Sequence, residues 1–142
     1  HGAVFDLGTE TLSKKEIKEF AKLVDPQPIH IDEKAAKRSP FGAIIASGLH
    51  PFVRFNKHYW VPMVATHFIC GLGMSEVRFF KPAYVGEPMT AKLRIISLEP
   101  KPQKGTMVAT WRMDIYKESG TTQVCTVSFA SYHYMDESLK PS

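Results

Sequence analysis

The hydrophobic pattern of this 142-residue chain changes period once, and that change limits the folds open to it. Up to Trp60 the apolar residues recur at helical spacing, and from Met74 onward they alternate as they do in strands. The strands expected from this alternation cover residues 74–81, 90–98, 106–116 and 122–135. On the third strand one face carries Met107, Ala109, Trp111, Met113 and Ile115. Helices followed by antiparallel strands predict an α+β protein, and the length predicts a single domain over residues 1–142.

The first expected helix follows a short strand over residues 4–11. Ser13 and Glu16 have the spacing of a capping box, in which each side chain binds the other's backbone N–H. The apolar residues behind them follow the i, i+3, i+4, i+7 pattern of one buried helical face, namely Ile17, Phe20, Ala21 and Val24. Pro26 ends the helix, because the residue before a proline is disfavoured in the helical region. Asp25 is therefore expected at the helix exit, with an extended backbone.

Two further helices are expected before the strands begin. Residues 26–31 read as a proline-stiffened loop, and Asp32 is placed to cap a short helix over residues 33–38. A longer helix is expected over residues 48–60, with Pro51 tolerated in its first turn. Its predicted buried face consists of Leu49, Phe52, Val53, Asn56 and Trp60. This helix is the natural cover for the apolar face of the sheet.

The charge and hydropathy of the chain exclude several classes of protein. The formal net charge is +4, but the 18 basic residues are scattered with no run of three, which argues against a nucleic-acid-binding surface. No apolar run approaches the roughly 18 residues that a membrane helix needs. No signal peptide is visible at the N-terminus. We therefore expect a cytoplasmic protein that binds neither nucleic acid nor membrane.

The metal-ligating residue types do not form a recognisable site. Cys70 and Cys125 lie far apart in apolar surroundings, so two buried free thiols are expected, although a disulfide stays open if the protein is exported. No Cys-x-x-Cys spacing occurs. The remaining histidines lack metal-ligand spacing as well, these being His50, His58, His67 and His133. No bound metal is expected.

The segment that carries chemistry is Asp25-Pro-Gln-Pro-Ile-His30-Ile-Asp32. It places a carboxylate and an imidazole five residues apart in a loop that two prolines stiffen. Acid–base chemistry needs such a pair, because one group takes a proton while the other gives one, and stiffness keeps both oriented. The alternative is that Asp25 caps a neighbouring backbone and His30 is a packing residue.

This segment resembles the signature of the MaoC-like dehydratases and (R)-specific enoyl-CoA hydratases. The signature reads Asp-x-Asn-Pro-x-His-x-Asp and is followed by an apolar, Phe-containing stretch that ends in His-Gly. The matching positions in this chain are Asp25, Pro28, His30, Asp32 and Gly48. Phe79-Phe-Lys-Pro82 and Val85-Gly-Glu87 are similar to a later strand–turn element of the family, so the resemblance covers nearly the whole chain.

The resemblance implies a hot-dog fold, in which an antiparallel sheet wraps around a central helix, and a homodimer or higher homo-oligomer. It also implies fatty acid metabolism: the hydration of a trans-2-enoyl-CoA to a 3-hydroxyacyl-CoA, or the reverse dehydration. The substrate would be an acyl-CoA or acyl-carrier thioester, with no cofactor besides the coenzyme A of the substrate. Asp25 and His30 would hold the water and share the proton transfers. The N–H of Gly48 would bind the thioester oxygen, and one such donor is typically worth about 3 kcal/mol in the transition state.

Two positions depart from the family signature. Gln27 replaces the usual Asn and is one methylene longer, so any hydrogen bond that it makes to the loop or the substrate is repositioned. Ser47 replaces the usual His before Gly48, and its hydroxyl is expected to cap the following helix. Neither change removes the proposed acid–base pair, so the choice of substrate is more affected than the type of reaction.

Three other residues are candidates for the substrate pocket. Asn56 is either a polar residue near the pocket or a core amide bonded to backbone. Phe41 and Phe52 either line an acyl pocket or pack in the core. Asp32 is expected to be a helix cap rather than a catalytic group.

Two other functions remain open. One is an acyl-CoA thioesterase of the same fold, although such enzymes tend to carry their carboxylate on the central helix, and residues 48–60 contain no Asp or Glu. The other is a non-catalytic subunit that binds an acyl thioester. The Gln27 and Ser47 departures favour this second alternative, and the intact Asp25 and His30 pair opposes it.

Overall fold

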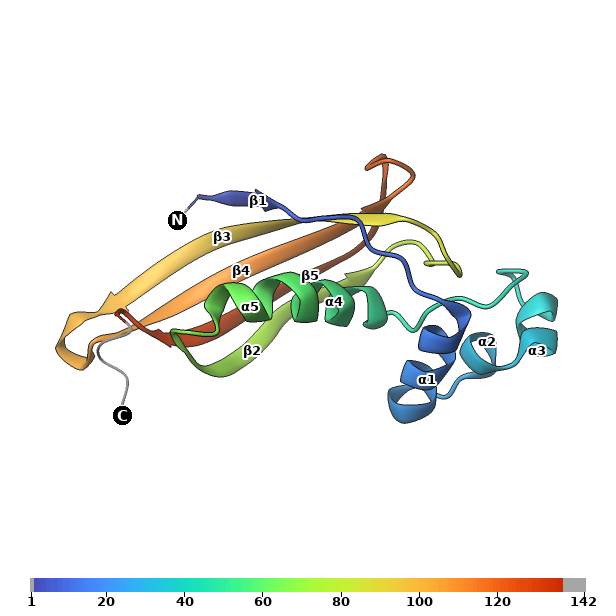
Figure 1. The fold of residues 1–142 in the computed structure, drawn as a ribbon, viewed down its shortest axis with the longest axis horizontal. Coiled ribbons are helices and arrows are strands. Elements are labelled where there is room, and N and C mark those ends of the chain that lie inside the picture. Colours follow the sequence, from blue (N-terminus) through green and yellow to red (C-terminus); the bar gives the residue numbers. More distant parts are fainter. Residues whose placement is uncertain (1, 137–142) are drawn as a thin grey trace.

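The sheet is the largest element of the computed structural model, which describes residues 2–136 (Figure 1). Its five strands pair antiparallel in the order β1-β3-β4-β5-β2. The strands are β1 Val4–Asp6, β2 Phe68–Phe79, β3 Met89–Lys101, β4 Thr106–Lys117 and β5 Thr122–Tyr134. The sheet curves around one long helical segment, which confirms the expected α+β hot-dog fold.

The central strand β4 shows why the sheet faces the helix as it does. Its alternation is as expected, since Ala109, Trp111, Met113 and Ile115 are buried and Met107 is half-buried on the same face. Neighbouring β5 adds Val127 and Phe129 to the same core. Alternate side chains of these strands therefore point to the same face, and this is the surface that the helix covers.

The first helix, α1 (Lys14–Val24), has the predicted start and end. The Ser13 hydroxyl accepts from the Glu16 N–H at 3.1 Å, and the Glu16 carboxylate accepts from the Ser13 N–H at 3.0 Å, which completes the capping box. The helix ends at Val24, before Pro26, and Asp25 leaves the helical region with φ −159° and ψ 70°. The expected exit position of Asp25 is confirmed.

The prediction of a loop over residues 26–31 is wrong in part, because the second half of this segment forms a single helical turn, α2 (Pro28–Ile31). Pro28 occupies the first position of this turn, where a proline costs no hydrogen bond. The next helix, α3 (Glu33–Arg38), has the expected bounds. The Asp32 carboxylate caps it by accepting from the N–H groups of Lys34 and Ala35, as predicted.

The central helical segment comprises α4 (His50–Phe55), a wider turn η1 (Asn56–Trp60) and α5 (Val61–Val64). In the wider turn the Val61 N–H donates to the Asn56 carbonyl, five residues back, just before Pro62. A proline supplies no N–H and commonly disturbs the hydrogen-bond ladder of the preceding turn. The predicted end at residue 60 is therefore wrong, since the helical path continues to Val64.

The buried face of this segment also differs from the prediction. Leu49 is 38% and Val53 40% exposed, and Asn56 is half-buried. The side chains that face the sheet are Phe52, Phe55, Trp60 and Val64. The extra residue in the wide turn lets Phe55 and Trp60, five apart, share one face, a spacing that a regular helix does not allow.

Several strand limits differ from the expected ones. The first strand is shorter and ends at Asp6, and β2 begins at Phe68 rather than at residue 74. β3 continues through residues expected in a turn and ends at Lys101, and the chain reverses at Gly105, which has a positive φ of 67°. Hydrogen bonding to a neighbouring strand extends these elements beyond their alternating cores.

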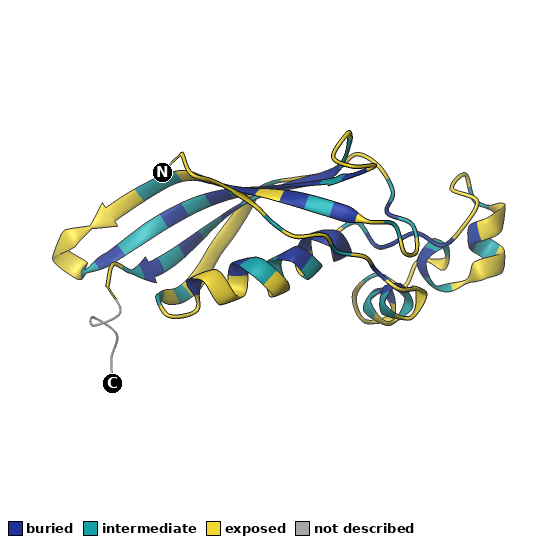
Figure 2. Ribbon diagram, turned by 45° about the horizontal axis from the view of Figure 1, so that its top comes forward, coloured by how far each residue is buried: buried dark blue, intermediate teal, exposed yellow. Residues whose placement is uncertain are grey.

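The two cysteines are both free, but only one is buried. Cys125 lies in the core, where burial raises the pKa of its thiol to about 12. Cys70 is exposed on β2, so the expectation of two buried thiols is wrong. Cys70 belongs to an edge strand that is exposed along almost its whole length (Figure 2).

Candidate functional site

Asp25, His30 and Ser47 come together from three separate segments. The His30 Nε2 lies 3.3 Å from the Asp25 Oδ2, and the Ser47 hydroxyl donates to the same oxygen at 2.8 Å. Asp25 is the residue that ends α1, His30 lies in α2, and Ser47 precedes α4. The fold thus closes a carboxylate–imidazole pair and adds a hydroxyl to it.

A backbone carbonyl fixes the orientation of the His30 ring. The His30 Nδ1 lies 2.7 Å from the Ile45 carbonyl oxygen, in a buried contact. That oxygen can only accept, so Nδ1 carries a proton, and Nε2 is the nitrogen directed at Asp25. The His30 side chain is 6% exposed, whereas the Asp25 side chain is 36% exposed. A proton at Nε2 or at Asp25 can therefore pass between a buried ring and a carboxylate that solvent reaches.

Ser47 does not cap the following helix, which corrects the expectation. The residue that precedes α4 is Leu49, and the start of that helix has no side-chain cap. The buried Ser47 side chain is directed instead at Asp25, 22 residues earlier in the chain. A neutral hydroxyl at this position can only stabilise the carboxylate by donating to it, whereas a histidine could also titrate.

Gly48 supplies a free backbone donor beside this pair. Its N–H donates to no acceptor among residues 2–136. A Cβ at this position would lie 2.8–2.9 Å from three atoms of the Phe79 ring, which is closer than side chains pack. Glycine is therefore the residue that lets the ring close over this part of the backbone.

A cavity of about 250 Å³ lies beside this pair. His30, Ser47 and Gly48 line it, whereas Asp25 does not and reaches it only through its contacts with His30 and Ser47. The other lining residues are Phe41, Ile45, Ala46, Pro51, Phe79, Phe80, Lys81, Pro82, Ala83 and Val124. The cavity is mostly apolar with a few convergent polar groups, which is typical of a small-molecule site.

A family model described as "MaoC like domain" matches residues 1–114. The chain belongs to the MaoC-like family. A curated relative, the uncharacterized protein YdeM of Bacillus subtilis (strain 168), is 31% identical over 102 residues, which cover 70% of this chain and 72% of YdeM. The expected family membership is confirmed over the segment that contains Asp25, His30 and Gly48.

Several solved structures share the fold of this chain. A MaoC-like dehydratase from Rhodospirillum rubrum is 27% identical, with a TM-score of 0.77 over 94% of this chain and 91% of that one. A protein from Archaeoglobus fulgidus described as a monoamine oxidase regulatory protein has a TM-score of 0.83 and 21% identity, over 95% and 90% of the two chains. An (R)-hydratase from A. caviae involved in PHA biosynthesis has a TM-score of 0.69 and 24% identity, over 91% and 92%.

Of the remaining candidate residues in this MaoC-like chain, some line the cavity and others do not. Phe41 lines the cavity with 38% of its surface exposed. Gln27 is exposed, and its side chain makes no hydrogen bond within residues 2–136. Phe52 is buried in the core against Phe129, with ring centroids 5.5 Å apart. Neither Asn56 nor Phe52 is among the residues that line this cavity.

Three of the residues that line the cavity were not assigned to a site from the sequence. Phe79, Phe80 and Lys81 line the cavity from the end of β2 and the turn that follows it. The signal for them was the strand–turn resemblance at residues 79–82, which indicated a structural element rather than a site. Within residues 2–136, no group of three or more His, Cys, Asp or Glu side chains is arranged to hold a metal ion. None of the helices described is long and apolar enough to cross a membrane.

Proposed function

We propose that this MaoC-like protein hydrates a trans-2-enoyl-CoA to a 3-hydroxyacyl-CoA, or catalyses the reverse dehydration. The observation that carries the proposal is the 3.3 Å contact of Asp25 with His30, because His30 lines one cavity together with Gly48, whose N–H has no acceptor within residues 2–136. The match to the MaoC-like family and the similarity to a solved MaoC-like dehydratase support a reaction of this class.

The proposed hydration uses the pair in one proton cycle. A water molecule bound between Asp25 and His30 loses a proton to Asp25 as its oxygen forms a bond to C3 of the enoyl group. The electron pair of the C2–C3 double bond moves toward the thioester, and His30 Nε2 donates a proton to C2. Transfer of the first proton from Asp25 to His30 restores both groups, so one water is added and none of the protein's protons is lost.

The charge that develops during this reaction needs a partner. As the bond to C3 forms, negative charge accumulates on the thioester oxygen. The Gly48 N–H has no acceptor among the described residues and lines the same cavity, so it can donate to that oxygen. A single donor of this kind is worth about 3 kcal/mol in the transition state.

The carrier portion of the substrate requires contacts outside the reacting centre. Lys81 is exposed and lines the cavity, so it is the basic residue best placed to meet the phosphates of coenzyme A. Coenzyme A enters here as part of the substrate and not as a bound cofactor. Binding through such an exposed charge should weaken as salt rises, because charge pairs are screened within roughly 10 Å at 0.1 M salt.

Residues of the central segment argue against the thioesterase alternative. His50–Val64 contains no Asp or Glu that could act as a base or nucleophile on the helix. The non-catalytic alternative has no specific observation in its favour, because Ser47 binds Asp25 without displacing His30 from it.

The proposed active form is a homodimer. β2 is one of the two edge strands of the sheet and is exposed on both faces. It carries five exposed large apolar side chains: Phe68, Leu72, Met74, Val77 and Phe79. Unpaired strand edges of this length favour pairing with another strand. Pairing of two β2 strands would also place a second subunit beside Phe79, which lines the cavity.

The proposal is tested by incubating the protein with a panel of 2-enoyl-CoAs of different chain lengths. Hydration removes the conjugated double bond, so the ultraviolet absorbance of the enoyl thioester falls while no free thiol appears. Release of free coenzyme A in the same samples would indicate a thioesterase. No change in either signal with any chain length would contradict the proposed hydration.

A further inference from the structure

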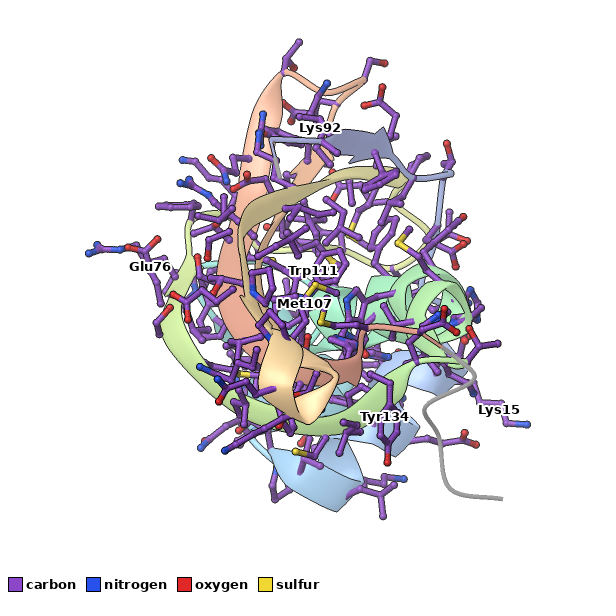
Figure 3. The ribbon with its side chains drawn as sticks, turned by 90° about the vertical axis from the view of Figure 1, so that its left-hand side faces the viewer. Lys15, Glu76, Lys92, Met107, Trp111 and Tyr134 are labelled. Carbon is purple, nitrogen blue, oxygen red and sulfur yellow. The ribbon has the colours of Figure 1, made fainter. Side chains whose placement is uncertain are left out.

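A second cavity lies at the opposite end of the sheet from Asp25 and His30. It has a volume of about 370 Å³, and its walls come from β1, α5, β3, β4 and β5. Figure 3 looks toward this end, where Met107 and Trp111 lie inside the curve of the sheet. In Figure 1 it corresponds to the end where β4 begins, whereas α2 and the candidate active site lie at the other end. None of its lining residues belongs to the first cavity.

The lining of this distal cavity is largely apolar and carries no formal charge. Its lining includes Met63 and Val64 of α5 and Ile95 and Leu98 of β3. Among the residues that the structure describes, no Asp, Glu, Lys or Arg lines it. An apolar compound would gain from burial here, at roughly 25 cal/mol for each Å² of apolar surface removed from water.

Three buried polar side chains form a series of hydrogen bonds beside this apolar cavity. The Trp111 Nε1–H donates to the Ser131 Oγ at 2.8 Å, and the Ser131 Oγ lies 2.6 Å from the His133 Nε2. All three residues are at least nine-tenths buried. The Trp111 indole can only donate to the Ser131 Oγ, so it cannot accept the hydroxyl proton of Ser131. That proton is therefore directed at the other partner of the hydroxyl, the His133 Nε2. Nε2 then accepts, and a neutral His133 carries its proton on Nδ1.

The remaining nitrogen of His133 is a donor without a partner. Its Nδ1 makes no hydrogen bond within residues 2–136, and His133 lines the cavity. Burial lowers the pKa of His133, and the nearby His67 lowers it further, so the ring is neutral at pH 7. A neutral donor in an apolar cavity favours an uncharged acceptor, because burying a carboxylate without a counter-charge is costly.

We infer that the distal cavity binds an uncharged aliphatic compound with one carbonyl-type acceptor, such as a ketone or an ester, whose oxygen accepts from His133 Nδ1. The aliphatic part would lie against Met63, Ile95 and Leu98. This site does not depend on the proposed hydration, since the residues that line it do not line the cavity at His30.

The two tryptophans of the chain make this inference measurable. Trp111 lines the cavity, and the Trp60 ring centroid is 6.0 Å from that of Trp111, so both fluorophores report on it. Titration of the intact protein with 2-octanone should change the tryptophan emission in a saturable way. The Asp25→Asn variant should give the same curve, because Asp25 belongs to the other site. Octanoate at pH 8 should bind at least tenfold more weakly than the ketone.

Two substitutions test the polar and the apolar half of the site separately. His133→Phe keeps a ring among the aromatic neighbours but removes the donor, and should weaken 2-octanone binding roughly tenfold. Ile95→Phe adds bulk at a half-buried wall position and should weaken it at least as much. His58→Phe, the same replacement at an exposed histidine outside the cavity, should change nothing. Circular dichroism identifies any variant that fails to fold.

Several results would overturn the inference. One is the lack of any saturable change with 2-octanone, and another is unchanged affinity in both folded variants, His133→Phe and Ile95→Phe. Loss of the response in Asp25→Asn would assign the binding to the first cavity instead. Octanoate binding as tightly as the ketone would contradict the uncharged-acceptor assignment.

Discussion

At the scale of single residues, the site depends on which groups contact each carboxylate oxygen of Asp25. The Oδ2 of Asp25 receives both the Ser47 hydroxyl and the contact with His30 Nε2. Its Oδ1 makes no hydrogen bond within residues 2–136, so this oxygen is free to accept from a water molecule. The Ile45 carbonyl holds the far side of the imidazole. The carboxylate and the ring are thus both oriented before a substrate binds, which is what acid–base catalysis requires.

The Ser47 hydroxyl is expected to matter for turnover more than for binding. Ser47→Ala removes a hydrogen bond to a charged acceptor, and bonds of this type contribute about 1.5–3 kcal/mol. We expect kcat to fall roughly 10- to 100-fold, with KM changed by less than about threefold, because the hydrogen bond that is lost is the one to Asp25. Steady-state kinetics on an enoyl-CoA measures both. A variant with the kcat of the natural protein would show that Asp25 does not need this hydroxyl.

The contact between Gly48 and Phe79 predicts a compensating pair of substitutions. Gly48→Ala places a methyl group 2.8–2.9 Å from the Phe79 ring atoms, so ring or backbone must move and the N–H is displaced. We expect kcat/KM to fall at least tenfold, and the double variant Gly48→Ala/Phe79→Ala to recover part of the loss. Gly71→Ala is the matched control, since its added methyl meets nothing within 4 Å. Equal activity of the single and double variants would contradict the steric account.

At the scale of elements, the packing of α1 against the start of α4 gives the fold a pH dependence. His50 in the first turn of α4 is stacked on Phe20 of α1, with ring centroids 4.2 Å apart, and its buried Nδ1 has no hydrogen-bond partner among residues 2–136. Burial lowers the pKa of His50 to about 4, and Arg54 adds to this. The folded protein therefore holds this ring neutral where the unfolded chain, with a pKa of 6.5, would protonate it.

The sign of the effect follows from proton linkage. Between pH 6.5 and pH 4 the unfolded state binds a proton at His50 that the folded state does not, so the free energy of unfolding falls as the pH falls. One such group contributes at most about 1.4 kcal/mol per pH unit. His50→Phe should flatten this dependence in urea titrations over that range, while His133, whose pKa is also lowered, supplies a remaining slope. An unchanged slope in His50→Phe would contradict the assignment.

The elements also show which features the sequence could predict. The capping box of Ser13 and Glu16 and the Asp32 cap join residues at most three apart, so local spacing was sufficient to predict them. The wide turn at Asn56–Trp60 precedes Pro62 and brings Trp60 onto the buried face of Phe52 and Phe55, which the period of a regular helix did not predict.

In the candidate site, too, some features could be predicted from the sequence and others could not. Asp25 and His30 were predicted from their five-residue spacing together with the family resemblance, and Phe41 was predicted to lie either in the pocket or in the core. The Ser47 contact with Asp25 and the Phe79 ring beside Gly48 join segments distant in the chain. Long-range contacts of this kind depend on the tertiary fold, and the residue types alone do not specify them.

At the scale of the whole molecule, the exposed β2 edge predicts self-association. Leu72 and Met74 are 53% and 56% exposed on this strand, and pairing of two such edges would cover both. We expect light scattering at micromolar concentration to give the mass of a dimer or a larger assembly. Replacing both residues with Lys should shift the protein toward the monomer, because like charges would face each other across the pair.

A matched substitution distinguishes this edge from general surface hydrophobicity. Leu23 on α1 is 85% exposed, and Leu23→Lys should leave the mass unchanged. A natural protein that is monomeric at micromolar concentration would contradict assembly through β2.

The central claim is that Asp25 and His30 perform the proton transfers of hydration. It is tested most directly by the turnover of Asp25→Asn, His30→Gln and the double variant on one enoyl-CoA, with Asp32→Asn as the control. We expect each single change to reduce kcat by roughly 10²–10⁴-fold, and the double variant to be little worse, because the two residues act as a unit. Asp32→Asn should keep most of the activity, since Asn also caps a helix. A folded Asp25→Asn protein with near-natural turnover would contradict the claim, as would losses in the two single variants that simply multiply in the double.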